Sequence, residues 1–426
     1  MAEAGREQAP ALRRSLGLID AVGIGFGAIV GAGIFVVTGV AAGVAGPALL
    51  LALPLAGIAA AANALSSAEL AASYPQAGGT YEYGYRVLHP WAGFAAGWMF
   101  LASKTAAAGT VGLGVAAYLA RVAPAVPGRA VALVAIALFT LVNLLGVKKS
   151  SATNLAIVAV SAATLVAFAA AGAVRFDAAY LRPFAPGGAG GVLQAAALLF
   201  FAYTGYARVA TLGEEVRDPR RTIPRAILIT VSTVSVLYLA VVLAAVGAGG
   251  TVAMARSDAP LAEVARTMRL PALETAVSLG AVCAMLGVLL SQLLGLSRMV
   301  FAMARRGDLP AALARVDAAS GTPRRAVLLV GAGAAAAAAF GTLRAIVPAA
   351  SFAILLYYAI ANLAALRMPR EAKLYPDAVP AVGLAACLLL AASLSLRTAV
   401  VGMAVLAAGF AVRGLTRALA GHPSRD

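Results

Sequence analysis

Apolar stretches of about 20 residues make up most of this sequence, and short clusters of charged residues separate them. Of the 426 residues, 62% are hydrophobic and 12% are charged. A helix needs about 20 apolar residues to cross the hydrocarbon core of a bilayer, and lipid requires every backbone polar group to be bonded internally, so the pattern predicts an all-α membrane protein. We expect about twelve transmembrane helices, at residues 18–43, 46–73, 90–120, 128–146, 152–174, 190–213, 223–247, 271–304, 325–341, 347–366, 377–396 and 398–416.

The basic residues predict that both chain termini face the cytoplasm. An even number of spans places the two ends on one side, and with residues 1–17 inside, the cytoplasmic loops hold roughly twice as many Lys and Arg residues as the opposite loops. Residues 1–17 lack a small-residue cleavage site, so we interpret them as a cytoplasmic tail and not as a signal peptide. Residues 417–426 form a second cytoplasmic tail. The alanine-rich composition is typical of a GC-rich bacterial genome, which favours a bacterial plasma membrane as the location.

Composition also excludes several classes of protein. The formal charge of +16 is explained by the basic loops, so no nucleic-acid partner is expected. The only histidines are His89 and His422, and Cys283 and Cys387 lie in separate apolar stretches, so neither a metal centre nor an enzyme is indicated. No Walker motif is present, so transport would be driven by an ion gradient or by exchange, without a cofactor. The pattern does not specify an oligomeric state.

Two of the predicted spans are interrupted. The first contains GAIVGAGIF at residues 27–35, and the sixth contains FFAYTGY at residues 200–206. Glycine in a membrane helix can simply allow close packing. Breaks in the corresponding spans of two halves, however, indicate an inverted-repeat transporter whose substrate site lies near the middle of the bilayer. A channel is a less favoured alternative, because no charged ring or repeated filter motif is evident.

These segments resemble a known family. GAIVGAGIF, the stretch FFAYTGY…EEVRDPRRTIPRAI at residues 200–227 and GLSRMVFAMARRGDLP at residues 295–310 look like the motifs of the amino acid–polyamine–organocation (APC) transporters, and the resemblance covers nearly the whole chain. It implies a five-plus-five inverted repeat of the LeuT type with broken helices 1 and 6. Residues 18–366 would form this transport core, and residues 367–416 would form two peripheral helices.

A broken helix can bind the two charged groups of an α-amino acid without a charged side chain. The half-helix after a break presents free N–H groups and a positive dipole end to a carboxylate, and the carbonyls before a break accept from an ammonium group. We expect the amides to be those of Ala32, Gly33 and Ile34, and the carbonyls to be those of Ile29, Phe201, Ala202 and Thr204. By resemblance Tyr206 is a gate over the ligand; the alternative is an ordinary core aromatic residue.

The coupling ion is the second part of the predicted site. Lys104 lies in the middle of the third span, where an ionisable residue is by default functional. Many proton-coupled APC members carry a lysine in the fifth span, and the matching position here is Ser161. Lys104 would then supply the titrating or fixed charge. The alternatives are a sodium ion held by the carbonyls of Gly27 and Val30 with the hydroxyl of Ser291, or uncoupled exchange of amino acids or polyamines.

Arg208 follows the break in the sixth span. It would pair with Glu214 or another acid, either as part of an inner gate or as a structural ion pair. The predicted substrate is a small molecule, an amino acid. Because few side chains near the breaks are charged, a neutral or weakly polar amino acid is favoured over a cationic one.

Overall fold

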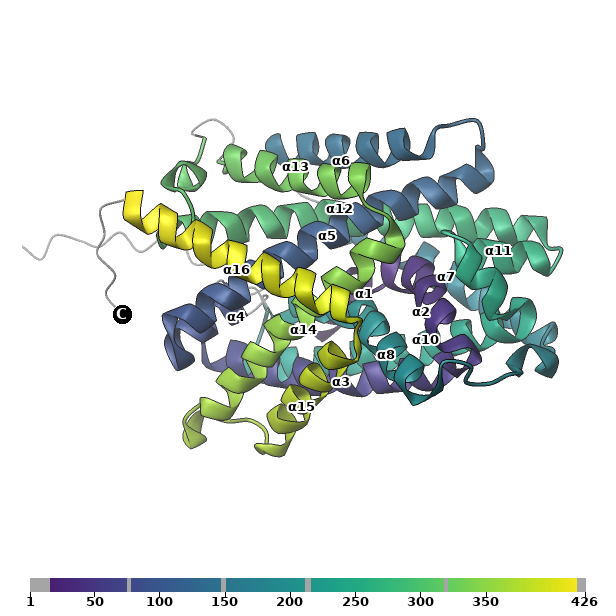
Figure 1. The fold of residues 1–426 in the computed structure, drawn as a ribbon, viewed down its shortest axis with the longest axis horizontal. Helices are drawn as coiled ribbons and strands as arrows, with labels where there is room; N and C mark the ends of the chain where they lie inside the picture. Colours follow the sequence, from purple (N-terminus) through teal and green to yellow (C-terminus); the bar gives the residue numbers. More distant parts are fainter. Residues whose placement is uncertain (1–15, 75–77, 147–150, 211–215, 318–320, 420–426) are drawn as a thin grey trace, which may run out of the picture.

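The computed structural model describes residues 16–74, 78–146, 151–210, 216–317 and 321–419. These residues form helices and loops, with one isolated β-bridge between Leu16 and Val216. The all-α prediction is therefore confirmed, and each predicted span coincides with helix (Figure 1). Most of the two predicted tails, residues 1–15 and 420–426, lies outside the described residues.

The first five spans occupy residues 18–174, with short helices between some of them. Their elements are α1 (Leu18–Ile29), η1 (Gly33–Val37), α2 (Thr38–Ala45), η2 (Gly46–Ala48), α3 (Leu49–Ser73), α4 (Thr80–Tyr83), η3 (Gly84–Leu88), α5 (Pro90–Val122), α6 (Gly128–Leu144) and α7 (Ser151–Val174). The next five spans occupy residues 188–367. Their elements, with the preceding η4 (Ala178–Leu181), are α8 (Gly188–Tyr203), η5 (Thr204–Tyr206), α9 (Ala207–Ala210), α10 (Pro219–Arg256), α11 (Pro260–Thr267), α12 (Pro271–Arg305), η6 (Ala311–Ala314), α13 (Arg324–Phe340) and α14 (Leu343–Arg367).

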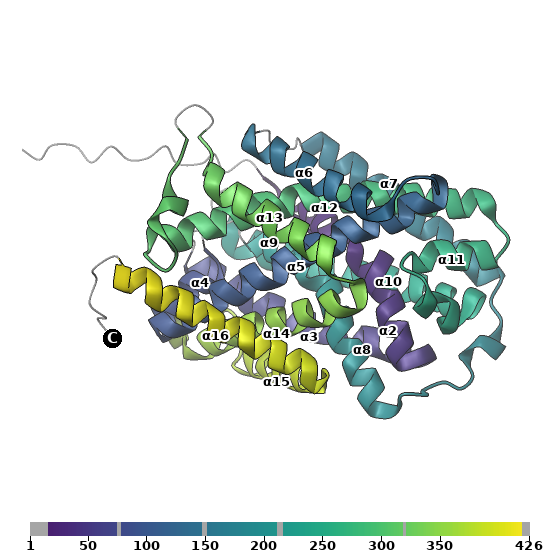
Figure 2. The ribbon, with the colours of Figure 1, turned by 45° about the horizontal axis from the view of Figure 1, so that its top comes forward.

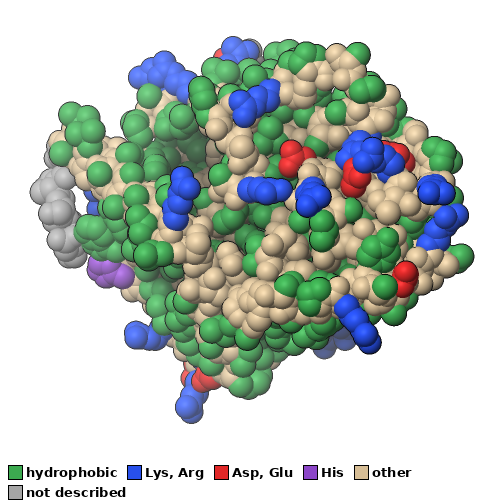
Figure 3. Space-filling model, turned by 45° about the vertical axis from the view of Figure 1, so that its right-hand side comes forward, with side chains coloured by type: hydrophobic (Ala, Val, Ile, Leu, Met, Phe, Trp, Pro, Cys, Tyr) green, Lys and Arg blue, Asp and Glu red, His purple; other side chains and the backbone are tan. Residues whose placement is uncertain are grey.

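The last two spans are α15 (Ala378–Ser393) and α16 (Leu396–Leu419), preceded by η7 (Arg370–Ala372). Within the described residues, eight helical segments are long and apolar enough to cross a membrane, and the first of them, Leu18–Ser73, contains both of the first two predicted spans. The shorter apolar helices α6 and α15 and the 17-residue α13 account for the remaining predicted spans. In the space-filling view, hydrophobic side chains cover wide areas, and charged side chains are scattered between them (Figure 3).

Both predicted helix breaks are present. In the first span α1 ends at Ile29, Val30 adopts an extended backbone (φ −74°, ψ 107°), and helix resumes as the π-helix η1 at Gly33. In the sixth span α8 ends at Tyr203, and the 3-10 turn η5 leads into the four-residue helix α9. The seventh span continues beyond its predicted end at residue 247, because α10 runs on to Arg256 across a kink at Gly250 (φ 73°).

The packing of the spans repeats with an offset of five along the chain. The second span, α3, corresponds to the seventh, α10, and the first span corresponds to the sixth. α3 packs against the sixth span, α8, and α10 packs in the same way against the first span, α1 and α2. The third span, α5, packs against α13 and α14, just as the eighth, α12, packs against α6 and α7. Five is an odd number, so two such halves cross a bilayer in opposite directions. This is the inverted repeat that the sequence predicted.

The last two helices lie on the outside of these ten spans. α15 packs against α3 and α14, and α16 packs against α5 and α14. Both views show α16 running obliquely along the surface of the bundle (Figures 1 and 2). Most of α16 is exposed, which suits contact with lipid. The domain boundaries at residues 366 and 416 remain predictions.

Candidate substrate-binding site

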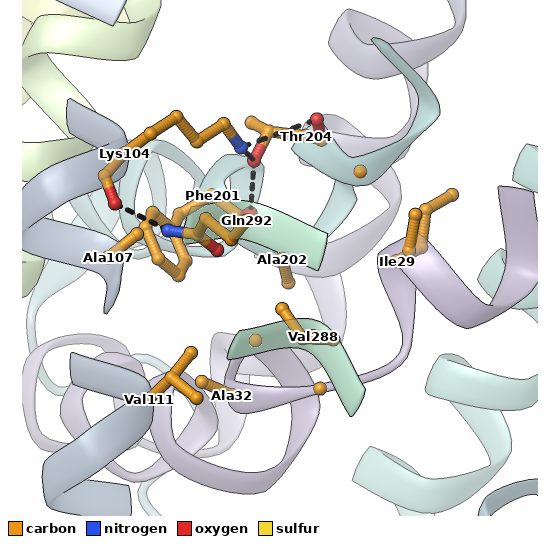
Figure 4. Close-up of a pocket in the computed structure, with 14 residues that line it drawn as sticks. Ile29, Ala32, Lys104, Ala107, Val111, Phe201, Ala202, Thr204, Val288 and Gln292 are labelled. Atoms are coloured by element: carbon orange, nitrogen blue, oxygen red, sulfur yellow. Dashed lines mark hydrogen bonds between the residues drawn. The ribbon is translucent and has the colours of Figure 1, made fainter. Parts of the chain in front are cut away.

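A small cavity lies where the two broken spans meet, and its volume is about 40 Å³. Besides the two breaks, α5 and α12 form its walls (Figure 4). The lining residues are Ala28, Ile29, Gly31, Ala32 and Gly33 of the first span, Lys104, Ala107 and Val111 of α5, Phe201, Ala202, Thr204 and Gly205 of the sixth span, and Val288 and Gln292 of α12. The structure thus brings together six of the predicted binding residues and Lys104.

Glycines let the two breaks touch backbone to backbone. A Cβ atom on Gly33 would lie 2.4 Å from the Cα atom of Ala202, and one on Gly205 would lie 2.1 Å from the carbonyl oxygen of Ala28. Side chains at these positions would push the two spans apart, since such distances are far below van der Waals contact. Each break therefore packs a glycine against the other break, and together they form one continuous wall of the cavity.

The break in the first span leaves backbone groups available for a ligand. The first N–H groups of a helix have no intrahelical partner, and η1 begins at Gly33. The N–H group of Phe35 donates to the carbonyl of Gly31 at 3.3 Å. On the other side of the break, the hydroxyl of Tyr238 donates to the carbonyl of Ile29 at 3.1 Å. A carbonyl oxygen has two lone pairs, so Ile29 keeps the capacity to accept from a ligand.

The break in the sixth span is bonded to Lys104. The Lys104 Nζ atom lies 2.9 Å from Thr204 Oγ1 and 3.5 Å from the Thr204 carbonyl oxygen. The Thr204 hydroxyl in turn donates to the carbonyl of Phe201 at 2.9 Å. Lys104 is therefore the donor to Thr204 Oγ1, because the hydroxyl hydrogen is already used (Figure 4).

Sequence reasoning missed the walls that α5 and α12 contribute. Ala107 and Val111 follow Lys104 at helical spacing, and Val288 and Gln292 are four residues apart on α12, so each set lies on one helix face. The spacing from Lys104 was a usable signal for Ala107 and Val111. On α12 the sequence analysis selected Ser291 and missed Val288 and Gln292. Gln292 also bonds to the backbone of Lys104, because its Nε2 atom donates to the Lys104 carbonyl.

The other predicted binding residues lie beside the cavity but do not line it. Ile34 is buried in η1, immediately after Gly33. Tyr206 is fully buried, and its ring packs against Tyr358 of α14 with the centroids 5.4 Å apart. Its predicted role as a gate remains a prediction.

The alternative coupling residues also lie outside the cavity wall. Gly27 faces α7, where an added Cβ would meet Val158 at 2.7 Å, and Val30 is buried. The hydroxyls of Ser161 and Ser291 donate to carbonyls of their own helices, at 2.7 Å to Ile157 and at 3.0 Å to Gly287. Arg208 is half-buried in α9, and its predicted partner Glu214 lies outside the described residues.

Buried charge at one end of the bundle ties α16 to the core. Asp308 is fully buried after α12, and it accepts from the hydroxyls of Tyr81 and Tyr85 and from the guanidinium groups of Arg413 and Arg417. The Arg413 Nε–Asp308 Oδ1 distance is 2.8 Å. A buried carboxylate is stable only with such partners, so this cluster holds the segment after α12, the helices at residues 80–88 and α16 together.

A second ion cluster connects α11 to α5 at the other end. Arg121 of α5 lies 2.6 Å from Glu263 of α11, which also pairs with Arg266 at 2.6 Å. Burial alone would raise the pKa of Glu263, but the hydrogen bonds from Arg266 and Arg121 outweigh burial and hold that pKa below its ordinary value. The hydroxyl of Tyr118 donates to the Phe35 carbonyl at 2.5 Å, so α5 also touches the half-helix that follows the first break.

Two broken spans in inverted repeats, meeting at a small cavity inside an all-helical membrane bundle, define a secondary transporter. A family model described as amino acid permease matches residues 20–416, and the chain belongs to this family, within the APC superfamily. It is a transporter of small molecules and not an enzyme.

Three relatives illustrate the range of the family. The chain is 45% identical over 408 residues to an uncharacterized transporter from Mycobacterium tuberculosis, covering 95% of this chain and 92% of the relative. It is 32% identical over 410 residues to the methylthioribose transporter of Bacillus subtilis, covering 90% and 89% of the two chains. It is also 32% identical over 332 residues to a branched-chain amino acid permease of Bacillus subtilis, covering 73% and 71%.

Proposed function

We propose that this chain carries amino acids across a bacterial plasma membrane by alternating access, in symport with protons. The observation that carries the proposal is the cavity between the two breaks, where the start of one half-helix and the end of another contribute to one small space. A zwitterion has the two complementary charges for these helix ends.

The backbone would recognise the two groups that all amino acids share. The substrate carboxylate would accept from the N–H groups of Ala32, Gly33 and Ile34 at the positive end of η1. The substrate ammonium would donate to the carbonyls of Ile29, Ala202 and Thr204, and to that of Phe201 in place of one of the two bonds that this carbonyl accepts from Thr204. Side chains on α5 and α12 are then left to select among amino acids.

Lys104 is the proposed coupling group. It is the one charged side chain among the residues that line the cavity, and it is bonded directly to the break in the sixth span. A protonated and a neutral lysine bind differently to a neighbouring zwitterion, so protonation and substrate binding are linked. The competing model has a sodium ion near Gly27, Val30 and Ser291. The Ser291 hydroxyl donates to carbonyls of its own helix, and its oxygen keeps a lone pair for such an ion.

A thermal-shift screen of the purified protein tests the substrate class. We expect one or more of the twenty amino acids to raise the unfolding temperature, because a ligand at 100 times its Kd stabilises the folded state by about 2.7 kcal/mol. Putrescine and spermidine serve as comparison ligands. Stabilisation by these amines alone would contradict the proposed amino acid site.

The proposed orientation places both termini in the cytoplasm. The backbone N–H of Arg217 donates to the Leu16 carbonyl at 2.9 Å, so the start of the first span lies beside the basic segment 217–225. Basic segments stay preferentially in the cytoplasm, which supports this assignment.

Cysteine labelling in intact cells checks the orientation. Gly190 at the start of α8 is exposed, and a Cβ there meets nothing within 4 Å, so Gly190→Cys should react with an impermeant maleimide from outside. Arg221→Cys, at an exposed position near the start of α10, should react only after the membrane is permeabilised. The reverse pattern would show that the termini face outward.

A further inference from the structure

The cavity contains features that choose among amino acids, beyond the backbone groups that recognise all of them. One side holds the polar ends of Lys104, Thr204 and Gln292, and the opposite side is formed by Val111, Val288 and Ala32 (Figure 4). On the basis of the proposed function, we propose that Lys104 and Val288 are specificity-determining residues. They restrict the transporter to small neutral amino acids and exclude cationic amino acids and polyamines.

The charges that line the cavity are not balanced. The lining residues include one cation, Lys104, and no carboxylate. Among the described residues, Lys104 forms no salt bridge; its Nζ atom is bonded to Thr204. A neutral amino acid adds a zwitterion with no net charge. A cationic amino acid or a diamine adds a second unbalanced positive charge to the same small space.

The cost of that second charge is large enough to decide selectivity. Two unit charges within one small cavity repel by an amount equal to about a 100-fold change in affinity, at the effective dielectric constant of protein interiors. A cationic substrate needs a carboxylate or a set of free carbonyls facing its side chain, whereas the side chains opposite Lys104 are those of Val111, Val288 and Ala32, which are apolar. The charge of Lys104 therefore opposes basic side chains.

The small volume of the cavity limits the size of the substrate. A volume of about 40 Å³ corresponds to roughly three water molecules by this measure. Val288 limits the space directly, since its Cγ2 atom would lie 2.9 Å from a Cβ atom on Gly31. Val288 thus packs onto the backbone of the first break. Its side chain leaves room for a short substrate side chain only.

Matched ligands separate the two effects. L-norvaline and L-2,4-diaminobutanoate have side chains of equal length, and only the second carries a side-chain ammonium group. L-alanine is the small reference ligand. Binding of the three would be measured by calorimetry and uptake in proteoliposomes, for the wild type, Lys104→Met and Val288→Ala. The control variants are Lys373→Met, outside the cavity between α14 and α15, and Val282→Ala, elsewhere on α12.

We expect the wild type to prefer norvaline to diaminobutanoate by about 100-fold, and Lys104→Met to reduce that preference at least about tenfold. Val288→Ala should improve the affinity for norvaline relative to alanine by about tenfold and leave the charge preference unchanged. Both control variants should match the wild type. Lys104→Arg keeps the charge and should keep the discrimination.

The outcomes distinguish this inference from the proposed function. If the wild type binds L-alanine but accepts diaminobutanoate as readily as norvaline, or if Lys104→Met leaves the preference unchanged, charge selection by Lys104 is wrong and amino acid transport stands. If Val288→Ala leaves the ratio of norvaline to alanine unchanged, the size limit set by Val288 is wrong. If no variant binds or transports any of the three, the proposed function fails and this inference falls with it.

Discussion

Gly33→Val should abolish amino acid binding. The new Cβ atom would lie 2.4 Å from the Cα atom and 2.5 Å from the Cβ atom of Ala202, so the break of the first span must move away from the break of the sixth. That movement displaces the N–H groups assigned to the substrate carboxylate. Loss of one or two charge-assisted hydrogen bonds predicts a decrease in affinity of about 100-fold or more.

Calorimetry and thermal shift with L-alanine would measure this loss. Gly23→Val is the matched control, because it lies in the same span and its Cβ atom would meet nothing within 4 Å. Overpacking costs typically about 1–3 kcal/mol of stability, so reduced expression of Gly33→Val is an accompanying risk. Gly31→Ala then serves as a milder variant, since its Cβ meets only the Val288 side chain, at 2.9 Å, and no backbone atom of the sixth span. Wild-type affinity in both variants would remove the first span from the site.

The all-α fold and both breaks followed from local patterns. Apolar length alone identifies a membrane helix, because lipid offers no partner for a free backbone group. Glycines at positions 31 and 33 and the Thr204–Gly205 pair marked the breaks, and these lie where the helices end. The short helices α4 and α11 were not predicted. They follow the second and seventh spans, and each bonds to residues distant in the sequence: Thr80 of α4 to Tyr357, and α11 to Tyr118 and Arg121.

The sequence predicted the residues that the two helix breaks contribute to the cavity. It did not predict the residues that α12 contributes. The breaks supply Ala32, Gly33, Phe201, Ala202 and Thr204 to the cavity, because the interruption itself creates the binding groups. Val288 and Gln292 come from α12, which begins about 60 residues after the sixth span. The packing of the inverted repeat brings α12 against α5. A single sequence does not show which helices distant along the chain are in contact.

Lys104→Met should abolish proton-driven accumulation while leaving binding and exchange of L-alanine in place. The backbone of the two breaks is assigned to the substrate, whereas Lys104 is the one charged side chain of the cavity. A methionine has a similar length but cannot carry a proton, so the substrate can still bind and the link to the proton gradient is lost.

Proteoliposomes allow the three driving forces to be compared for the wild type and Lys104→Met. Uptake of L-alanine would be measured with an inward proton gradient, with an inward sodium gradient, and with internal alanine alone. For the wild type we expect accumulation with the proton gradient; for Lys104→Met we expect only equilibration, with exchange retained. Full proton-driven accumulation by Lys104→Met would make the lysine a selectivity element without a coupling role. Wild-type uptake that requires sodium and ignores pH would favour the site near Gly27, Val30 and Ser291, where backbone carbonyls and a hydroxyl are the oxygen ligands that a sodium ion needs.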